Sequence, residues 1–168
     1  MDRNLGRMGN LQSPKSGKRS EAENLKIIEE ILKPHPGNIL KIVGELRKKI
    51  SSFFPEWEER GYPVWKAIGF RDPKQGYICG IFPFSERVQL IFEWGVLFTD
   101  PKKKLKGETK QIRYLEYSSW NEIDSDLILY YLRQSLELPP GKKEKEFMIS
   151  DRVPKSLPPS KKKSKRKT

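Results

Sequence analysis

The sequence predicts an α+β fold in which an antiparallel four-stranded meander sheet carries N-terminal helices and a C-terminal helix packed on one face. Two observations support this prediction. Apolar residues recur at helical spacing near both ends of residues 20–140, while the stretch between them is rich in aromatic and β-branched residues. Short polar links separate the expected strands, which favours antiparallel neighbours that follow one another across the sheet.

Two helices are expected before the strands. Ser20 and Glu23 fit a capping box that opens the first helix, over residues 21–33. Asn38 is a suitable N-cap for the second, over residues 39–54. The apolar residues of this second helix are spaced by four and three positions, which places them on one face: Ile39, Val43, Leu46, Ile50 and Phe53.

The four strands are expected over residues 64–70, 77–84, 87–94 and 112–118. The C-terminal helix should follow directly. A second capping box, Ser119 with Glu122, marks its start. Acidic residues near that start suit the positive end of the helix dipole. Two Pro residues and a Gly are expected to end the fold: Pro139, Pro140 and Gly141.

The positive charge lies near the ends of the chain. The net charge is +12, yet residues 21–140 carry equal numbers of acidic and basic side chains. We therefore predict a disordered basic N-terminal tail over residues 1–19, one domain over residues 20–140, and a disordered Lys-rich C-terminal tail over residues 141–168. The expected domain itself gives no electrostatic sign of nucleic-acid binding.

Cysteine content and hydropathy indicate a compartment. Cys79 is the only cysteine, which excludes an intrachain disulfide and suggests a reducing environment. The first thirty residues lack the apolar core of a signal peptide. No stretch approaches the roughly 20 apolar residues of a membrane helix. A cytoplasmic location with no membrane partner is the expectation.

Three glutamates form a candidate metal site just after the second helix: Glu56, Glu58 and Glu59. Carboxylates are hard ligands that suit iron. The alternative is a solvated helix end, where Arg60 neutralises one of the charges. A closed transition-metal site is not expected from one histidine and one cysteine. His35 lies between two prolines and is expected to be an exposed spacer.

A second candidate site is a ligand cleft that accepts an anion, formed by Trp65, Lys106, Gly107, Arg113 and Tyr114. The guanidinium group of arginine offers a bidentate fork to a carboxylate or phosphate, and glycine lets the backbone approach a ligand. The alternative reading gives the arginine a structural ion pair and the glycine a turn.

A third candidate site is the basic C-terminal tail, with a further basic loop over residues 102–110. Polycationic segments bind nucleic acid by releasing counterions, without reading sequence. A tail that only solubilises the protein is the alternative. The tail residues in question are Lys161, Lys162, Lys163, Lys165, Arg166 and Lys167. No nucleophile with a plausible histidine partner is apparent, so no catalytic residue is predicted.

Several short motifs then occur in a recognisable order. They are Gly61-Tyr62-Pro63, Gly95–Pro101, Leu105-Lys106-Gly107, Gln111–Tyr117 and Glu122-Ile123-Asp124. In order and spacing, over about residues 25–137, the chain resembles the YdhG-like family of small prokaryotic proteins, a conserved domain of unknown function. The resemblance implies a compact frataxin-like fold and, for some members, an iron-chaperone role. It supplies no catalytic motif.

Three functions follow as expectations. The first is a non-enzymatic YdhG-like protein that binds iron weakly and delivers it to iron-receiving proteins. The second is a nucleic-acid-associated protein anchored by its basic tails. The third is a small-anion-binding module around Arg113.

Overall fold

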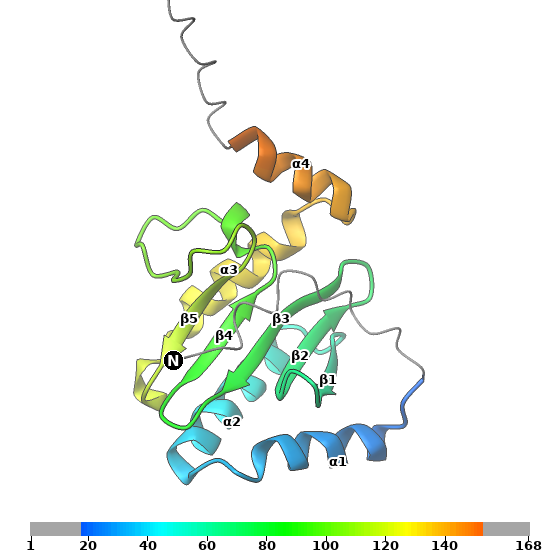
Figure 1. The fold of residues 1–168 in the computed structure, drawn as a ribbon, viewed down its shortest axis with the longest axis vertical. Coiled ribbons are helices and arrows are strands. Elements are labelled where there is room, and N and C mark those ends of the chain that lie inside the picture. Colours follow the sequence, from blue (N-terminus) through cyan, green and yellow to red (C-terminus); the bar gives the residue numbers. More distant parts are fainter. Residues whose placement is uncertain (1–17, 153–168) are drawn as a thin grey trace, which may run out of the picture.

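The computed structural model describes residues 18–152, which form four α-helices and one antiparallel sheet of five strands in the order β1-β2-β3-β4-β5 (Figure 1). The helices are α1 (Glu21–Leu32), α2 (Gly37–Phe53), α3 (Ser125–Glu137) and α4 (Lys142–Arg152). The strands are β1 (Glu58–Tyr62), β2 (Ala67–Asp72), β3 (Gly76–Pro83), β4 (Val88–Phe92) and β5 (Arg113–Tyr117). The α+β class and the antiparallel meander are confirmed.

The prediction of four strands was wrong, because β1 was missed. Its sequence, Glu-Glu-Arg-Gly-Tyr, lacks the β-branched pattern of a central strand. β1 lies at the edge of the sheet, and within the described part of the chain its one partner strand is β2, from Glu58 opposite Arg71 to Tyr62 opposite Ala67. Charged residues are common on edge strands because they discourage pairing with other chains.

The two N-terminal helices differ in how they begin. The capping box of α1 is confirmed: the Ser20 hydroxyl accepts from the Glu23 N–H, and the Glu23 carboxylate accepts from the Ser20 N–H. The N-cap prediction for α2 was wrong, since that helix begins at Gly37 behind Pro36 with no side-chain cap. α2 is anchored by buried residues instead.

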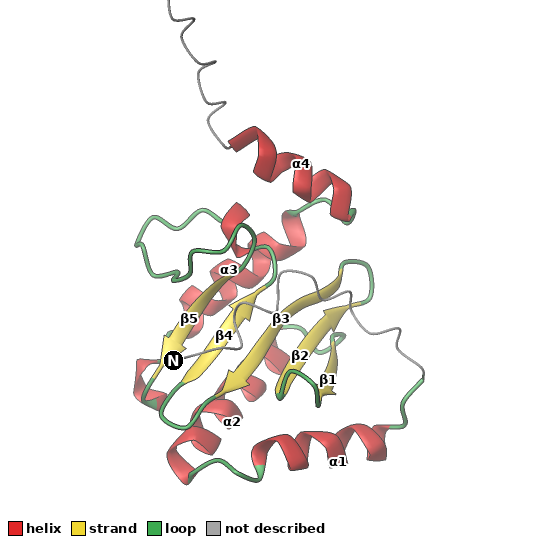
Figure 2. Ribbon diagram, viewed as in Figure 1, coloured by secondary structure: helices red, strands yellow, loops and turns green. Residues whose placement is uncertain are grey.

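The main core lies between one face of the sheet and two helices. Figure 2 shows α2 and α3 on the same side of the sheet, while α1 packs against β1 at its edge. Buried side chains from α2, the strands and α3 form one cluster there, for example Leu46, Phe70, Leu90 and Tyr131. Burial of this apolar surface is the main stabilising contribution.

The second predicted capping box, Ser119 with Glu122, is present but belongs to another helix. It caps the short 3-10 helix Trp120–Glu122, and α3 begins later, behind Asp124. The Asp124 carboxylate accepts from the backbone N–H groups of Asp126 and Leu127, both at 3.1 Å.

The structure also differs from the predicted C-terminal boundary, because α4 follows the Pro-Pro-Gly sequence. Lys145 of α4 is buried, with its ammonium group 5.3 Å from the centroid of the Trp94 ring. Arg152 donates to the Leu97 carbonyl at 3.1 Å.

Within residues 18–152 no helix has both the length and the apolar composition that crossing a membrane requires.

Candidate binding face of the sheet

The sheet has a second face that no described helix covers (Figure 2). Side chains alternate along each strand, so residues paired across strands share a face. On this second face Tyr62 is paired with Ala67, and Ile91 with Tyr114. A smaller apolar cluster lies here, made only of strand and loop residues: Ala67, Phe82, Ile91 and Ile112.

Aromatic rings gather on this surface, which is called the aromatic face below and is defined by Tyr62, Trp65, Tyr77, Phe82, Phe84 and Tyr114. The Tyr62 and Trp65 rings stack with centroids 5.0 Å apart. Tyr77 meets both rings edge-on, each at 5.8 Å. Such stacked and edge-on arrangements are the favourable geometries for aromatic pairs.

The rings can lie this close to the strands because two glycines face them. Gly69 of β2 is paired with Gly80 of β3 on the aromatic face. A Cβ atom at Gly69 would lie 2.5 Å from Cε2 of Tyr62 and 2.7 Å from Cε2 of Tyr77, well inside van der Waals contact. The pair of glycines therefore makes room for the tyrosine rings.

Four rings of the aromatic face are partly exposed: Trp65, Tyr77, Phe84 and Tyr114. Three of them pack against the smaller apolar cluster: Trp65 of the β1–β2 turn, Phe84 directly after β3, and Tyr114 of β5. The guanidinium carbon of Arg87 lies 5.0 Å from the centroid of the Phe84 ring. Partly exposed rings on a common apolar base can stack against flat ligand groups.

A polar network lies beside these rings, centred on Glu116 of β5. Its carboxylate accepts from Gln89 at 2.9 Å and forms ion pairs with Arg87 at 3.3 Å and Lys106 at 3.5 Å. Desolvation acts to raise the pKa of the Glu116 carboxyl, but these partners outweigh it and hold the pKa below its ordinary value. Glu116 is therefore a fixed anion and not a proton donor.

Two buried polar atoms on this face have no hydrogen-bond partner among residues 18–152. They are the hydroxyl of Tyr62 and Oε1 of Gln89, whose residues are 5% and 1% exposed. Buried polar atoms are nearly always paired in native proteins, so each exception needs an explanation. A bound ligand that supplies the missing partners is one such explanation.

The predicted ligand cleft is assembled in part. Lys106 pairs with Tyr114 through reciprocal backbone hydrogen bonds of 2.9 Å. Gly107 adopts a φ of 116° next to the Tyr114 ring, a conformation that favours glycine. Trp65 packs against the same apolar cluster as Tyr114. The structure thus places Trp65, Lys106, Gly107 and Tyr114 on or beside one face of the sheet.

Arg113 does not join them. It is paired with Phe92, whose ring lies in the main core on the other face. Its guanidinium group donates to the carbonyl oxygens of Thr109 and Ile112, both at 2.6 Å, and so closes the loop that precedes β5. Arg113 therefore has a structural contact, as in the alternative interpretation, but its partners here are backbone carbonyl oxygens and not an acidic side chain.

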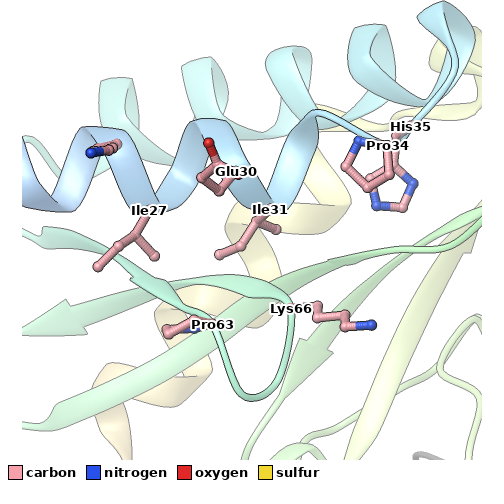
Figure 3. A pocket seen from close by; sticks show the side chains of 8 residues that line it. Ile27, Glu30, Ile31, Pro34, His35, Pro63 and Lys66 are labelled. Carbon is pink, nitrogen blue, oxygen red and sulfur yellow. The ribbon is translucent and has the colours of Figure 1, made fainter.

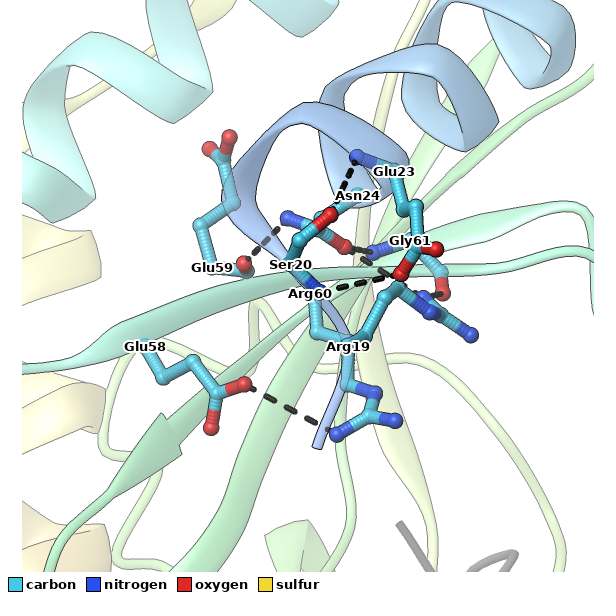
Figure 4. Close-up of polar contacts among 8 residues, drawn as sticks. All are labelled: Arg19, Ser20, Glu23, Asn24, Glu58, Glu59, Arg60 and Gly61. Atoms are coloured by element: carbon cyan, nitrogen blue, oxygen red, sulfur yellow. Dashed lines mark hydrogen bonds and ion pairs between the residues drawn. The ribbon is translucent and has the colours of Figure 1, made fainter. Parts of the chain in front are cut away.

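The three glutamates of the candidate metal site are used differently from one another; Figure 4 shows Glu58 with Arg60. Glu59 forms a bidentate pair with Arg47 of α2, at 2.6 and 3.0 Å. Glu58 forms an ion pair with Arg60 at 3.7 Å, and Glu56 is exposed before β1. In the part of the chain that the structure describes, no three His, Cys, Asp or Glu side chains form a group that could hold a metal ion. Iron binding at these residues stays a prediction based on the family resemblance.

The basic tail residues of the third candidate site, 161–167, lie outside the described residues, as does most of the predicted N-terminal tail. The sequence interpretation missed Tyr62, Tyr77, Phe82 and Gln89 as members of a site. The alternation of side chains along each strand could have identified them. Where the adjacent residues in a strand point into the main core, these residues point to the opposite face.

Comparisons with known proteins add no assignment. No family model, no curated protein and no solved structure matches this chain. The YdhG-like resemblance and its frataxin-like arrangement therefore stay predictions from the sequence. The site that the fold itself provides is the aromatic face.

Proposed function

We propose that this chain is a non-enzymatic protein that binds single-stranded nucleic acid on the aromatic face of its sheet. The observation that carries the proposal is the set of three partly exposed rings packed on the smaller apolar cluster, Trp65, Phe84 and Tyr114, on the face that no described helix covers. Every nucleobase has a flat π-face, so such rings serve as a stacking platform that tolerates any sequence.

Charge at the rim of the face supports the same ligand. Lys106, with 58% of its side chain exposed, lies beside Tyr114. The whole chain carries a net charge of +12, and the basic residues near its C-terminus would add contacts with phosphates that do not depend on sequence.

The buried hydroxyl of Tyr62 and Oε1 of Gln89 supply the polar part of the proposal. A phenol hydroxyl can donate to a ring nitrogen or carbonyl of a base, and an amide oxygen can accept from an exocyclic amine. A ligand that moves the rings enough to reach these atoms would satisfy groups that are otherwise unpaired.

The shape of the face favours single strands over a duplex. Bases in a duplex stack on each other and present only their edges, whereas unpaired bases can lie flat against aromatic side chains. Among residues 18–152, the aromatic face offers rings on a sheet and no helix of the kind that enters a major groove.

Fluorescence anisotropy with a labelled fifteen-nucleotide oligothymidine, its RNA counterpart and a duplex of equal length would test the proposal. Trp65→Ala, Phe84→Ala and Tyr114→Ala should each weaken binding of the single strands by about 5- to 150-fold, because a stacked base contributes about 1–3 kcal/mol. The duplex should bind more weakly than either single strand.

Trp120→Ala is the matched control, because this ring is 49% exposed but lies in the 3-10 helix after β5, with the ammonium group of Lys41 3.9 Å from its centroid. The control should bind like the unmodified chain. The proposal fails if the three sheet variants, shown to be folded by thermal unfolding, bind as tightly as Trp120→Ala.

A further inference from the structure

A groove lies between the β1–β2 turn and α1 (Figure 3), and none of its lining residues belongs to the aromatic face. Its volume is about 460 Å³, within the range of about 300–1,000 Å³ common for small-ligand sites. Ile27 and Ile31 of α1 point toward the turn, and Pro63 lies across from them. Pro34 closes the end of the groove beyond α1.

The charged groups of the groove lie around this apolar surface. Lys66 of the turn and His35 of the α1–α2 link lie near the same end, while Lys26 belongs to the start of the lining helix segment. Glu30 is the one acidic side chain in the lining. Lys66 adopts a φ of 53°, an uncommon conformation for a residue with a side chain and one that often marks functional positions.

The dimensions suit an aliphatic chain. The lining runs along α1 from Lys26 to Ile31, about 8 Å at the helical rise, and continues beyond the helix to Pro34. An extended eight-carbon chain is roughly 9 Å long at ordinary C–C bond lengths. Such a chain can lie along Ile27 and Ile31 while an anionic head reaches the ammonium group of Lys66.

A peptide strand is a poorer fit at this place. The backbone of β1 beside the groove is already paired: Asn24 bonds to the Glu59 carbonyl and the Gly61 N–H, and Arg19 donates to the Gly61 carbonyl (Figure 4). An added strand would have to displace these three hydrogen bonds before it could pair with the sheet edge.

We propose that this groove binds a small amphiphile with an aliphatic body and an anionic head, with Lys66 as the cation that recognises the head. The site is separate from the aromatic face, so it does not depend on nucleic-acid binding. Apolar contact supplies affinity for the body of the ligand, and the charge selects an acid over an alcohol of equal length.

Titrating octanoate, and separately octanol, into the full isotope-labelled chain and following amide and methyl NMR shifts would test this. Octanoate should give saturable shifts at Ile27, Ile31 and Lys66. Lys66→Gln should weaken octanoate by about two- to fivefold, as expected for an exposed charge pair, and leave octanol unchanged. Lys74→Gln, an exposed lysine of the β2–β3 turn, should change neither.

Ile27→Glu is the second variant, because a carboxylate within the groove should abolish octanoate binding while the dispersion of the spectrum reports folding. The proposal is overturned if shifts do not saturate, if they centre on the aromatic face, or if folded Ile27→Glu binds octanoate unchanged. Equal effects of Lys66→Gln on octanoate and octanol would overturn the role of Lys66.

Discussion

Asn24 of α1 is bonded to Gly61 of the edge strand β1 through its side-chain oxygen, which accepts from the Gly61 N–H at 2.9 Å. The amide nitrogen of the same side chain donates to the Glu59 carbonyl at 2.8 Å. One asparagine thus occupies a donor and an acceptor that a neighbouring strand would otherwise use. Arg19 adds a bond of 2.6 Å to the Gly61 carbonyl. Helix α1 therefore closes the β1 edge of the sheet.

Asn24→Ala should consequently destabilise the fold by about 1–3 kcal/mol, because it leaves partly buried backbone groups of β1 without partners. It should also promote association through the exposed edge. Urea unfolding and analytical ultracentrifugation measure the two effects. Glu29→Ala, an exposed change on the same helix, is the control. Equal stability of both variants would contradict the closing role of Asn24.

The second prediction concerns the contribution of the Arg47–Glu59 ion pair to the free energy of unfolding. Glu59 raises the pKa of Arg47, chiefly through their side-chain hydrogen bonds. Because the side chains are 29% and 22% exposed, the pair should contribute only about 0.5–1 kcal/mol. A double-mutant cycle with Arg47→Met and Glu59→Gln should measure a coupling of this size in urea.

The same Glu59→Gln variant tests the iron hypothesis. Glu59 is already paired with Arg47, whereas Glu58 is paired with Arg60. We therefore expect Glu59→Gln to leave the Fe(II) titration unchanged. The control is the triple change of Glu56, Glu58 and Glu59 to Ala. If the unmodified chain binds Fe(II) at submillimolar concentration and the triple change abolishes this binding, the three carboxylates do form a metal site.

The carboxyl group of Asp100 makes the free energy of unfolding depend on pH in the acidic range. Burial alone would raise the pKa of its carboxyl, but bonds from the Tyr131 hydroxyl at 2.5 Å and from the N–H groups of Leu105 and Lys104 outweigh it. The folded-state pKa therefore lies below the unfolded value of about 3.9. The stabilisation is complete above that value and is lost as the pH falls through the lower, folded-state pKa.

Asp100→Asn should therefore lower the unfolding midpoint at neutral pH and reduce the loss of stability on acidification below about pH 4. Thermal unfolding from neutral to acidic pH would show this, with Glu137→Gln on the exposed side of α3 as control. A pH profile of Asp100→Asn parallel to that of the unmodified chain would contradict the assignment.

Local signals in the sequence predicted what depends on local contacts. The capping box of Ser20 and Glu23 lies within one helical turn, and the structure contains it unchanged. β1 could not be recognised in this way, because its stability comes from β2 and from Asn24 of another helix. Propensity alone gives little weight to a strand that begins with two glutamates.

The candidate sites depended on which face each residue occupies, and this is fixed by register. Adjacent strand residues point to opposite faces, so Arg113 and Tyr114, neighbours in sequence, are separated by the sheet. Trp65 of the β1–β2 turn meets both Tyr62 of β1 and Tyr77 of β3, a contact that depends on how the two strands are placed. The residue types of a binding surface could be identified from the sequence. Which of these residues share one face depends on the strand register.

The C-terminal basic residues should contribute to nucleic-acid binding in a way that salt reveals. Deleting residues 153–168 removes seven Lys or Arg side chains. Each lost phosphate contact should reduce the slope of log affinity against log salt by about 0.7 for a single strand. Trp65→Ala should weaken binding without changing that slope. A slope unaffected by the deletion would show that the tail makes no phosphate contacts.

The paired glycines of β2 and β3 allow a test of the aromatic face that needs no ligand. Gly69→Ala places a methyl group against both Tyr62 and Tyr77, so the rings must move away from the sheet. Overpacking of this kind costs about 1–3 kcal/mol. The variant should lose near-ultraviolet circular dichroism and weaken single-strand binding together. Gly44→Ala is the matched control, since nothing lies within 4 Å of its added methyl group and alanine favours the helix. If Gly69→Ala retained both the dichroism and the binding, the close ring packing would not be what forms the face.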